Sequence, residues 1–267
     1  MYKKFLQKLK PKPPKLEYIE VHLVDHCNLN CKGCTHYSNL VTESSGSFLD
    51  LEEFECDINE ISKKVRLRKL RLMGGEPLLH PKIADFFYVA RKVFPNTYIS
   101  LVTNGILLNK MPDTFWKAVK ENNLFIDISK YPPVSHKMGD IIDLIDENKC
   151  TLGNIRAIRG FFPLFELDGS LNGHKDCSNL NCKNLRHGKL YICPSVAYLD
   201  IFNKYFNLNL PEDGGVDIYK SSGKELIKLI NSPIKLCKYC DGYKKKKLFP
   251  WEQSKCELSE WLMPDEE

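Results

Sequence analysis

Several features that would assign this chain to a common class of proteins are missing from its 267 residues. It has no apolar run of about eighteen residues or more, so we expect no membrane-spanning segment. Lysines interrupt the apolar residues nearest its amino terminus, so no signal peptide is expected and a cytoplasmic location is predicted. There is also no internal repeat at a fixed period.

Motifs for common cofactors are missing as well. The sequence contains neither Gly-x-Gly-x-x-Gly nor a Walker motif, which argues against a nicotinamide or ATP enzyme. The net charge is +5, and lysines crowd residues 3–15 and 244–247. No recognition motif or interleaved aromatic residues accompany these lysines, so nucleic acid is not an expected partner.

Cysteine, in contrast, is abundant, with eleven residues. In a reducing cytosol, clustered cysteines are metal ligands or catalytic thiols more often than disulfides. Cys27, Cys31 and Cys34 follow a short apolar strand. Their spacing suits three thiolates on one [4Fe-4S] cluster, which leaves the fourth iron without a protein ligand. Three unrelated buried cysteines, or part of a zinc site, are the alternatives at this point.

Strands and helices are predicted to alternate along the first two thirds of the chain. The predicted strands cover residues 17–24, 69–73, 98–102 and 124–129, with one or two more within 155–167. The predicted helices cover residues 51–65, 81–94, 112–122 and 138–147, the first with a capping box of Asp50 and Glu53. Short connections between such elements imply parallel strands, so we predict an α/β fold, an open, partial (β/α)6 barrel.

The composition changes after residue 170, where cysteine, asparagine, glycine and lysine replace the regular alternation. We therefore predict four regions along the chain. They are a basic, Pro-rich arm (1–16), the partial barrel (17–168), a small Cys-rich module (169–250) and a C-terminal tail (251–267).

Two more motifs stand at predicted strand ends, the edge where a βα barrel places its active site. Gly74-Gly75-Glu76-Pro77 follows the second strand. Its glycines let the backbone turn sharply and approach a ligand, and its carbonyls and Glu76 can accept hydrogen bonds from an ammonium group. Val102-Thr103-Asn104-Gly105 follows the third strand.

Together these three motifs resemble the radical S-adenosylmethionine (SAM) superfamily over residues 17–165. The resemblance implies that the open iron of a [4Fe-4S] cluster on Cys27, Cys31 and Cys34 chelates the methionine moiety of SAM. It also implies that the loop Gly74, Gly75, Glu76 and Pro77 meets the SAM ammonium group. Thr103 and Asn104 would lie near the nucleoside or methionine part, with Ser129 as a further contact.

One position departs from the family pattern. The family often has an aromatic residue just before the third cysteine, near the adenine, and here that residue is Gly33. We therefore expect the adenine contact from His36 or Tyr37. The implied chemistry is one-electron cleavage of SAM to a 5′-deoxyadenosyl radical, which removes a hydrogen from the substrate. A flavodoxin or ferredoxin is the implied reductant.

A second cysteine set resembles the auxiliary-cluster "twitch" module of radical SAM enzymes, a shortened SPASM domain. Cys177 is followed by Gly188 after ten residues and by Cys193 after four more, and Cys237-x2-Cys240 follows a long gap. Four thiolates would close a second [4Fe-4S] cluster completely. A closed zinc site has the same ligand number and is the alternative. Only Cys256 lies beyond, so one auxiliary cluster is expected.

The remaining reactive residues are assigned less firmly by their positions. Cys56 and Cys150 are expected in or near the core. Cys182 either replaces Cys177 as a ligand or donates a hydrogen atom to a substrate radical. Arg156 and Arg159 are the preferred substrate-binding candidates. Other candidates for a base near the active face are Lys130, His36 and His136.

The resemblance points most closely to twitch-type dehydrogenases of aminocyclitol biosynthesis. The expected reaction is therefore oxidation of a sugar-like or aminocyclitol-like alcohol, with the auxiliary cluster accepting the electron. Alternatives are a sugar epimerase that uses Cys182, or an enzyme that crosslinks or oxidises a peptide. A non-catalytic iron–sulfur or zinc-binding redox protein is the alternative from another class.

Overall fold

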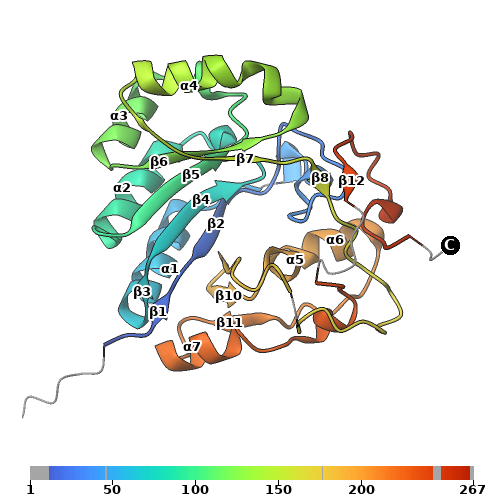
Figure 1. The fold of residues 1–267 in the computed structure, drawn as a ribbon. Helices are drawn as coiled ribbons and strands as arrows, with labels where there is room; N and C mark the ends of the chain where they lie inside the picture. Colours follow the sequence, from blue (N-terminus) through green and yellow to red (C-terminus); the bar gives the residue numbers. More distant parts are fainter. Residues whose placement is uncertain (1–11, 46, 176, 243–247, 265–267) are drawn as a thin grey trace, which may run out of the picture.

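The computed structural model describes residues 12–45, 47–175, 177–242 and 248–264. Most of the predicted basic arm and the lysine run 244–247 lie outside these residues. A central sheet of eight strands organises the described chain, in the order β11-β10-β9-β2-β4-β5-β6-β7 (Figure 1). Its strands are β2 (Ile19–Val24), β4 (Lys69–Gly74), β5 (Tyr98–Thr103), β6 (Phe125–Lys130), β7 (Thr151–Ala157), β9 (Asn184–Arg186), β10 (Lys189–Tyr191) and β11 (Gly215–Asp217).

The six strands from β9 to β7 pair in parallel, while β10 and β11 are antiparallel additions. The helices of the barrel connect successive parallel strands, and α1 to α3 lie along one side of the sheet (Figure 1). They are α1 (Leu51–Lys64), α2 (Ile83–Val93), α3 (Asp113–Glu121) and α4 (Met138–Glu147). This confirms the predicted α/β class and partial barrel.

The ends of these elements follow local chemistry. Asp50 caps α1 by accepting hydrogen bonds from the backbone nitrogens of Glu52 and Glu53 at 2.8 and 3.1 Å. The Glu53 carboxylate meets His187 at 2.8 Å, so the predicted reciprocal bond of a capping box is replaced by a contact with the C-terminal module. Lys149 has a φ of 54°, which turns the chain directly from α4 into β7. The last barrel strand therefore begins earlier than predicted.

The sheet crosses the predicted boundary near residue 168. Strand β9 pairs with β2 at Glu20 and Asn184, and the Glu20 backbone nitrogen donates to the Lys183 carbonyl at 2.8 Å. The C-terminal module also contains short helices α5 (Pro194–Ala197), α6 (Leu199–Phe206) and α7 (Gly223–Leu229). Two small sheets complete the strands, β1 (Lys15–Leu16) with β3 (Arg66–Leu67) and β8 (Gly160–Phe161) with β12 (Phe249–Pro250).

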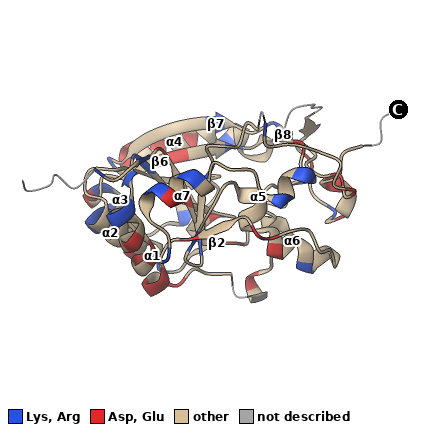
Figure 2. Cartoon of the chain, turned by 90° about the horizontal axis from the view of Figure 1, so that it is seen from below, with Lys and Arg blue, Asp and Glu red and all other residues tan. Residues whose placement is uncertain are grey.

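Single-turn and other short 3-10 helices lie in the connections. They cover Ser38–Leu40, Glu43–Ser45, Pro77–Leu79, Leu108–Lys110, Pro132–Lys137, Lys235–Lys238 and Leu258–Glu260. None of the helices in the described part of the chain is both long and apolar enough to cross a bilayer. Acidic and basic residues occur together along α1, α2 and α3 (Figure 2), as is typical of solvated helix faces.

Two hydrophobic cores support the fold. The first lies between the barrel strands and α1–α4. The second joins the C-terminal module to Tyr37 and Leu40 of the loop that follows the first cysteines, and it includes the fully buried Trp261. The predicted tail is therefore part of the packed structure. We call residues 249–262 the C-terminal strap.

Candidate functional site

A cavity of about 260 Å³ opens where the barrel strands end. Residues at or just beyond the carboxyl ends of β2, β4, β5, β6 and β7 line it on one side, and residues 178–194 of the C-terminal module line it on the other. Parallel strands bring their carboxyl ends to one edge, which explains why motifs far apart in sequence meet here. The predicted residues at this cavity are Cys27, Cys31, Cys34, His36, Gly74, Gly75, Thr103, Asn104, Ser129, Arg156 and Cys182.

Backbone and indole N–H groups point at the sulfurs of the first cysteine set. The Leu29 backbone nitrogen donates to Cys27 Sγ at 3.3 Å, and the Trp251 indole Nε1 donates to Cys31 Sγ at 3.1 Å. Backbone N–H groups of the segment 36–38 also lower the pKa of Cys34 against its burial. Donors of this kind stabilise thiolates, the form that binds iron.

Burial acts in the opposite direction. It raises the pKa of Cys27, Cys31 and Cys34, that of Cys31 to about 12. Thiolates in such surroundings require a cation beside them, so these three sulfurs fit an iron–sulfur cluster. Among the described residues, no three His, Cys, Asp or Glu side chains are grouped so as to hold a single metal ion. A [4Fe-4S] cluster takes one thiolate per iron, so its ligands do not meet at one ion.

The Gly74-Gly75 turn depends on the lack of side chains. A Cβ at Gly74 would lie 2.2 Å from the Val24 carbonyl oxygen, and one at Gly75 would lie 2.1 Å from that of His26. The turn therefore packs directly on the chain that leads into Cys27, and both glycines line the cavity. This close approach places a row of backbone groups next to the cysteine loop.

Glu76 and Pro77, also predicted as ligand contacts, are not among the residues that line the cavity. The buried Glu76 carboxylate accepts hydrogen bonds from Thr103 Oγ1 at 2.6 Å and from the backbone nitrogens of Asn104 and Leu78 at 2.9 and 3.2 Å. Burial raises the pKa of Glu76 to about 7. These three hydrogen bonds hold the glycine turn against the end of β5.

Asn104 then connects this assembly to the cysteine loop. Its Nδ2 donates to Asn28 Oδ1 at 2.7 Å, next to Cys27. Thr103 and Asn104 both line the cavity, as does Ser129 at the end of β6. The ends of β4 and β5 and the cysteine loop are therefore connected by direct hydrogen bonds and backbone packing.

Tyr37, the second residue predicted for an adenine contact, is not among the residues that line the cavity. Its φ of 54° turns the side chain into the second core, where its hydroxyl donates to the Ser195 carbonyl at 3.1 Å. Three aromatic residues that the sequence interpretation missed, Tyr131, Phe161 and Phe162, line the cavity. Tyr131 follows β6 directly, so its place at a strand end was the available signal.

The structure explains why position 33 is a glycine rather than an aromatic residue. Its φ is +67°, and a Cβ there would lie 2.9 Å from the Glu260 carbonyl oxygen and 3.5 Å from Phe161 Cβ. An aromatic side chain at this position would collide with the C-terminal strap. Phe161 of β8 therefore occupies the neighbourhood that the usual aromatic residue would need.

Polar side chains from β2, β4 and β7 line one wall of this cavity. Arg71 donates to Tyr18 Oη at 2.6 Å and pairs with Glu20 at 3.4 Å. Arg71, Glu20, Arg156 and Cys182 all line the cavity. Of the other predicted groups, Arg159, Lys130 and His136 do not, and the Arg159 carbonyl instead accepts a hydrogen bond from the Trp251 backbone.

The second cysteine set lines a separate small cavity. Cys177, Cys193, Cys237 and Cys240 all contribute to it, and Cys182 does not. Burial raises the pKa of Cys193 and Cys240 to about 12. The Gly242 backbone nitrogen donates to Cys240 Sγ at 3.4 Å. Four partly buried thiols around one cavity fit a closed cluster with no open iron.

Gly188 helps to shape this module. With His187 it forms the two-residue turn between β9 and β10, and both residues have positive φ, 49° and 68°. The turn directs β10 toward Cys193.

Cys56 is exposed on α1, so its predicted burial was wrong, while Cys150 packs against the first core. Cys256 lies in the strap, with its Sγ 3.6 Å from the Asn39 carbonyl oxygen.

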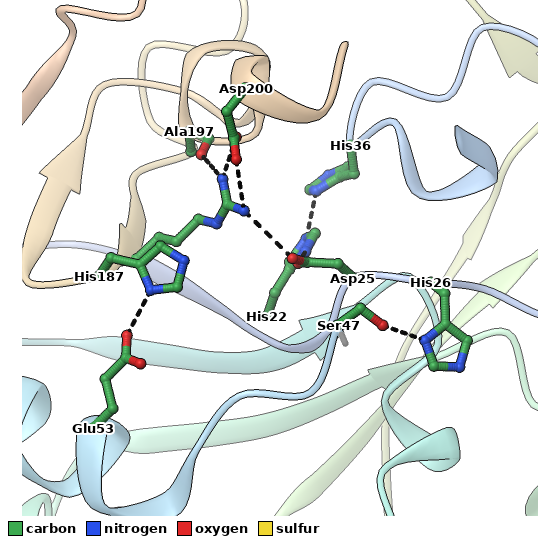
Figure 3. Close-up of polar contacts among 10 residues, drawn as sticks. His22, Asp25, His26, His36, Ser47, Glu53, His187, Ala197 and Asp200 are labelled. Atoms are coloured by element: carbon green, nitrogen blue, oxygen red, sulfur yellow. Dashed lines mark hydrogen bonds and ion pairs between the residues drawn. The ribbon is translucent and has the colours of Figure 1, made fainter. Parts of the chain in front are cut away.

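A polar network holds the cysteine loop against the module (Figure 3). His22 Nε2 lies 2.7 Å from His36 Nδ1, and His22 Nδ1 lies 3.0 Å from Asp25. Arg186 pairs with both Asp25 and Asp200. A cavity of about 530 Å³ lies beside this network, and none of the cysteines lines it. The three motifs meet instead at the cavity of about 260 Å³.

Comparison with known proteins agrees with this geometry. Residues 21–142 match the family model described as the Radical SAM superfamily. The chain contains a radical SAM domain. This domain spans the three cysteines, the Gly-Gly turn and the Thr103-Asn104 strand end, and radical SAM enzymes use SAM and a [4Fe-4S] cluster.

Curated relatives match over part of the chain only. GTP 3′,8-cyclase from Alkaliphilus oremlandii is 29% identical over 159 residues, covering 55% of this chain and 49% of that protein. The same enzyme from Microcystis aeruginosa is 28% identical over 114 residues, covering 42% of this chain and 35% of that protein. The chain thus spans less than half the length of these relatives.

Solved structures extend the likeness in fold over most of the chain. Native anSMEcpe with bound AdoMet has a TM-score of 0.55 and 14% identity, covering 84% of this chain and 82% of that one. BtrN in complex with AdoMet and 2-DOIA has a TM-score of 0.53 and 15% identity, covering 86% and 94%. This likeness includes the C-terminal module as well as the radical SAM domain.

Proposed function

We propose that this chain is a radical SAM oxidoreductase that dehydrogenates a sugar-like or aminocyclitol-like alcohol. One observation carries the proposal: Cys27, Cys31, Cys34 and the Gly74-Gly75 turn line the same cavity as a polar wall suited to a substrate. With SAM and its cluster bound, the site would supply a 5′-deoxyadenosyl radical able to remove a hydrogen atom from that substrate.

The radical SAM domain would bind SAM along the strand ends. Cys27, Cys31 and Cys34 would hold the [4Fe-4S] cluster. The backbone at Gly74 and Gly75 would meet the SAM ammonium group, as in the family that this domain resembles. Thr103, Asn104 and Ser129 would contact the rest of the molecule, since all three line the cavity.

Aromatic residues of the cavity would contact the adenine. Tyr131 and Phe161 offer flat apolar surfaces beside the cysteine loop, and His36 lies at the same cavity. They provide the stacking surface that Gly33 cannot, because the strap leaves no room for a side chain there.

Arg71, Arg156 and Glu20 would bind the substrate. A carboxylate accepts hydrogen bonds from hydroxyl or ammonium groups, and guanidinium groups donate to hydroxyl oxygens. A site with one carboxylate and two guanidinium groups suits a polyhydroxylated molecule with or without an amino group. Residues of the segment 178–194 also line this cavity and would help to exclude water from it.

The four cysteines Cys177, Cys193, Cys237 and Cys240 would hold an auxiliary [4Fe-4S] cluster. When bound, this cluster would supply an acceptor for the electron that must leave an oxidised alcohol. A flavodoxin or ferredoxin would be the reductant of the first cluster. Fold neighbours support a small-molecule or peptide substrate, since BtrN was solved with 2-DOIA and anSMEcpe with a Cp18Cys peptide.

Epimerisation is a second candidate, favoured by the position of Cys182. Its thiol lines the cavity of the first cysteine set, beside Glu20 and Arg156, and not the cavity of the second set. Burial raises the pKa of Cys182 to about 12, so its S–H bond is retained at neutral pH. This thiol would donate a hydrogen atom to a substrate radical, and the resulting thiyl radical would take up one electron from the reductant and one proton.

Anaerobic reconstitution tests both reactions. We expect about eight irons per chain, four for each cluster, and 5′-deoxyadenosine on addition of SAM and a strong reductant. Aminocyclitols, sugars and peptides are then compared by mass spectrometry in D2O. Dehydrogenation gives a product two hydrogens lighter, whereas epimerisation gives uptake of one deuterium that Cys182→Ala abolishes. If 5′-deoxyadenosine never forms, the proposed function is wrong.

A further inference from the structure

The C-terminal strap (residues 249–262) covers the cysteine loop, although more than two hundred residues separate them in sequence. The Lys32 backbone nitrogen donates to the Glu252 carbonyl at 3.0 Å, and that of Ser254 donates to the Asn30 carbonyl at 3.0 Å. These bonds form an antiparallel bridge opposite Cys31. The side chains of Lys32 and Glu252 add an ion pair at 2.8 Å. The strap therefore has a defined register on the loop.

Trp261 anchors the far end of the strap. Its indole is fully buried in the second core, and its Nε1 donates to the Cys34 carbonyl oxygen at 2.9 Å. The Trp261 carbonyl in turn accepts hydrogen bonds from the backbone nitrogens of Leu164 and Phe165 at 2.8 and 3.0 Å. An anchor of this kind fixes the strap independently of any bound cofactor.

Trp251, near the start of the strap, contacts one of the cysteine sulfurs. Its backbone nitrogen donates to the Arg159 carbonyl at 2.8 Å, and its indole Nε1 donates to Cys31 Sγ at 3.1 Å. Cys31 is the most buried of the three cysteines, at 5% exposure. The indole N–H therefore reaches a sulfur that bulk water scarcely contacts.

Such a bond has a definite effect on a cluster ligand. Hydrogen bonds to the sulfurs, together with solvent exposure, set the reduction potential of an iron–sulfur cluster. An N–H donor stabilises negative charge on the sulfur, and the reduced cluster carries one more electron than the oxidised cluster. The bond therefore favours the reduced state and raises the potential. In a buried site the effect is larger than in water.

We infer that Trp251 is a positioning residue that raises the reduction potential of the SAM-binding cluster through its N–H bond to Cys31. The strap thereby makes the first cluster easier to reduce by the electron donor. This inference rests on the proposed function, because it requires a cluster on Cys31.

The test compares Trp251→Phe with Trp116→Phe and Trp261→Phe in the full, reconstituted chain. Trp116 lies in α3, far from the strap in sequence, and controls for the loss of a buried indole. Trp261 controls for a strap indole that bonds to a carbonyl rather than to sulfur. The midpoint potential of the first cluster is measured by electron paramagnetic resonance (EPR) at defined potentials, and iron content is measured in each protein.

We expect Trp251→Phe to keep its iron and to lower the ratio of reduced to oxidised first cluster about tenfold at a fixed potential. For a one-electron couple this is a shift of about 59 mV to more negative values. Trp116→Phe should show no shift. An unchanged potential in iron-replete Trp251→Phe would overturn the inference and leave the proposed function standing. Failure of the wild-type protein to bind iron or cleave SAM would instead contradict the proposed function.

A second measurement needs no variant that must fold. Wild-type protein labelled with ¹⁵N at its indole nitrogens is reduced and studied by pulsed EPR. We expect a hyperfine coupling between the first cluster and one indole nitrogen. The absence of any ¹⁵N coupling in the wild-type protein would refute the bond to Cys31.

Discussion

The two cysteine sites differ in what surrounds them. The first has three sulfurs in a cavity that it shares with glycines, Thr103, Asn104 and the charged groups Glu20, Arg71 and Arg156. The second has four sulfurs in a smaller cavity whose remaining walls include Leu180, Ile192, Ile234 and Leu236. A site that leaves an iron open needs polar partners for the ligand of that iron. A closed site needs only shielding, so the surroundings agree with the ligand counts.

The largest effect is expected from Cys31→Ala, which removes a ligand from the first site only. SAM cleavage should be abolished, because three thiolates are needed to hold the cluster. Iron should fall from about eight to about four per chain, since each cluster holds four. Quantifying 5′-deoxyadenosine and iron checks this, with the exposed Cys56→Ala as control. Undiminished cleavage by Cys31→Ala would contradict the assignment of the first site.

Cys237→Ala should affect the second site in the complementary way. Iron should again fall to about four, yet SAM should still be cleaved because the first cavity is intact. The oxidised product should be lost, since its electron has no acceptor. The ratio of 5′-deoxyadenosine to product, measured by chromatography and mass spectrometry, checks this. Normal coupling of the two in Cys237→Ala would remove the electron-acceptor role from the second site.

Arg156 and Arg159 are both exposed, but only Arg156 lines the cavity proposed to bind the substrate. Arg156→Ala removes a guanidinium group that lines the cavity, and hydrogen bonds to charged groups contribute about 1.5–3 kcal/mol. We expect kcat/KM to fall about tenfold or more, with uncoupled SAM cleavage retained. Arg159→Ala is the matched control and should change kcat/KM less than twofold, roughly within the scatter of surface substitutions. Equal effects from the two changes would be evidence against this wall as the substrate site.

A smaller effect is expected from substitution of Glu76, which should change the pH dependence of the free energy of unfolding. Its folded-state pKa is raised from 4.5 to about 7 by burial, so the folded chain binds more protons than the unfolded chain between these values. Stability from this group is therefore present below about pH 4.5 and is lost as the pH rises toward 7, by about 3 kcal/mol.

Glu76→Gln should flatten this part of the profile. Urea unfolding of the full chain at pH 5 and pH 7.5, followed by circular dichroism, measures the difference in midpoint. The exposed Glu121→Gln serves as control. A profile for Glu76→Gln that matches that of the wild-type protein would show that this carboxyl group does not titrate as its burial requires.

Local patterns in the sequence were enough to predict the strands and helices of the barrel. The predicted helix 138–147 agrees with α4 at both ends, because its apolar residues repeat at helical spacing and Lys149 forces a turn after it. The motifs at strand ends could also be placed together, because parallel strands share an edge. Contacts made by the distant C-terminal strap could not be predicted in this way.

Gly33, Tyr37 and Glu76 show where local reasoning ends. Gly33 is required by Glu260, and Tyr37 packs in a core completed by Trp261, so both depend on residues more than two hundred positions away. Glu76 was predicted as a ligand contact because its carboxylate can accept hydrogen bonds from an ammonium group. Its hydrogen bonds with Thr103 and Asn104 appear only once β4 and β5 lie side by side.

The response of each cluster to SAM tests the distinction between the two sites most directly. With both proposed clusters in place, Cys237→Ala should retain only the first cluster and Cys31→Ala only the second. We predict that adding SAM to reduced Cys237→Ala changes its EPR spectrum, with hyperfine coupling from ¹⁵N in the SAM amino group, while Cys31→Ala is unaffected. A spectrum that responds to SAM in Cys31→Ala, or none that responds in Cys237→Ala, would contradict the assignment of an open first site and a closed second site.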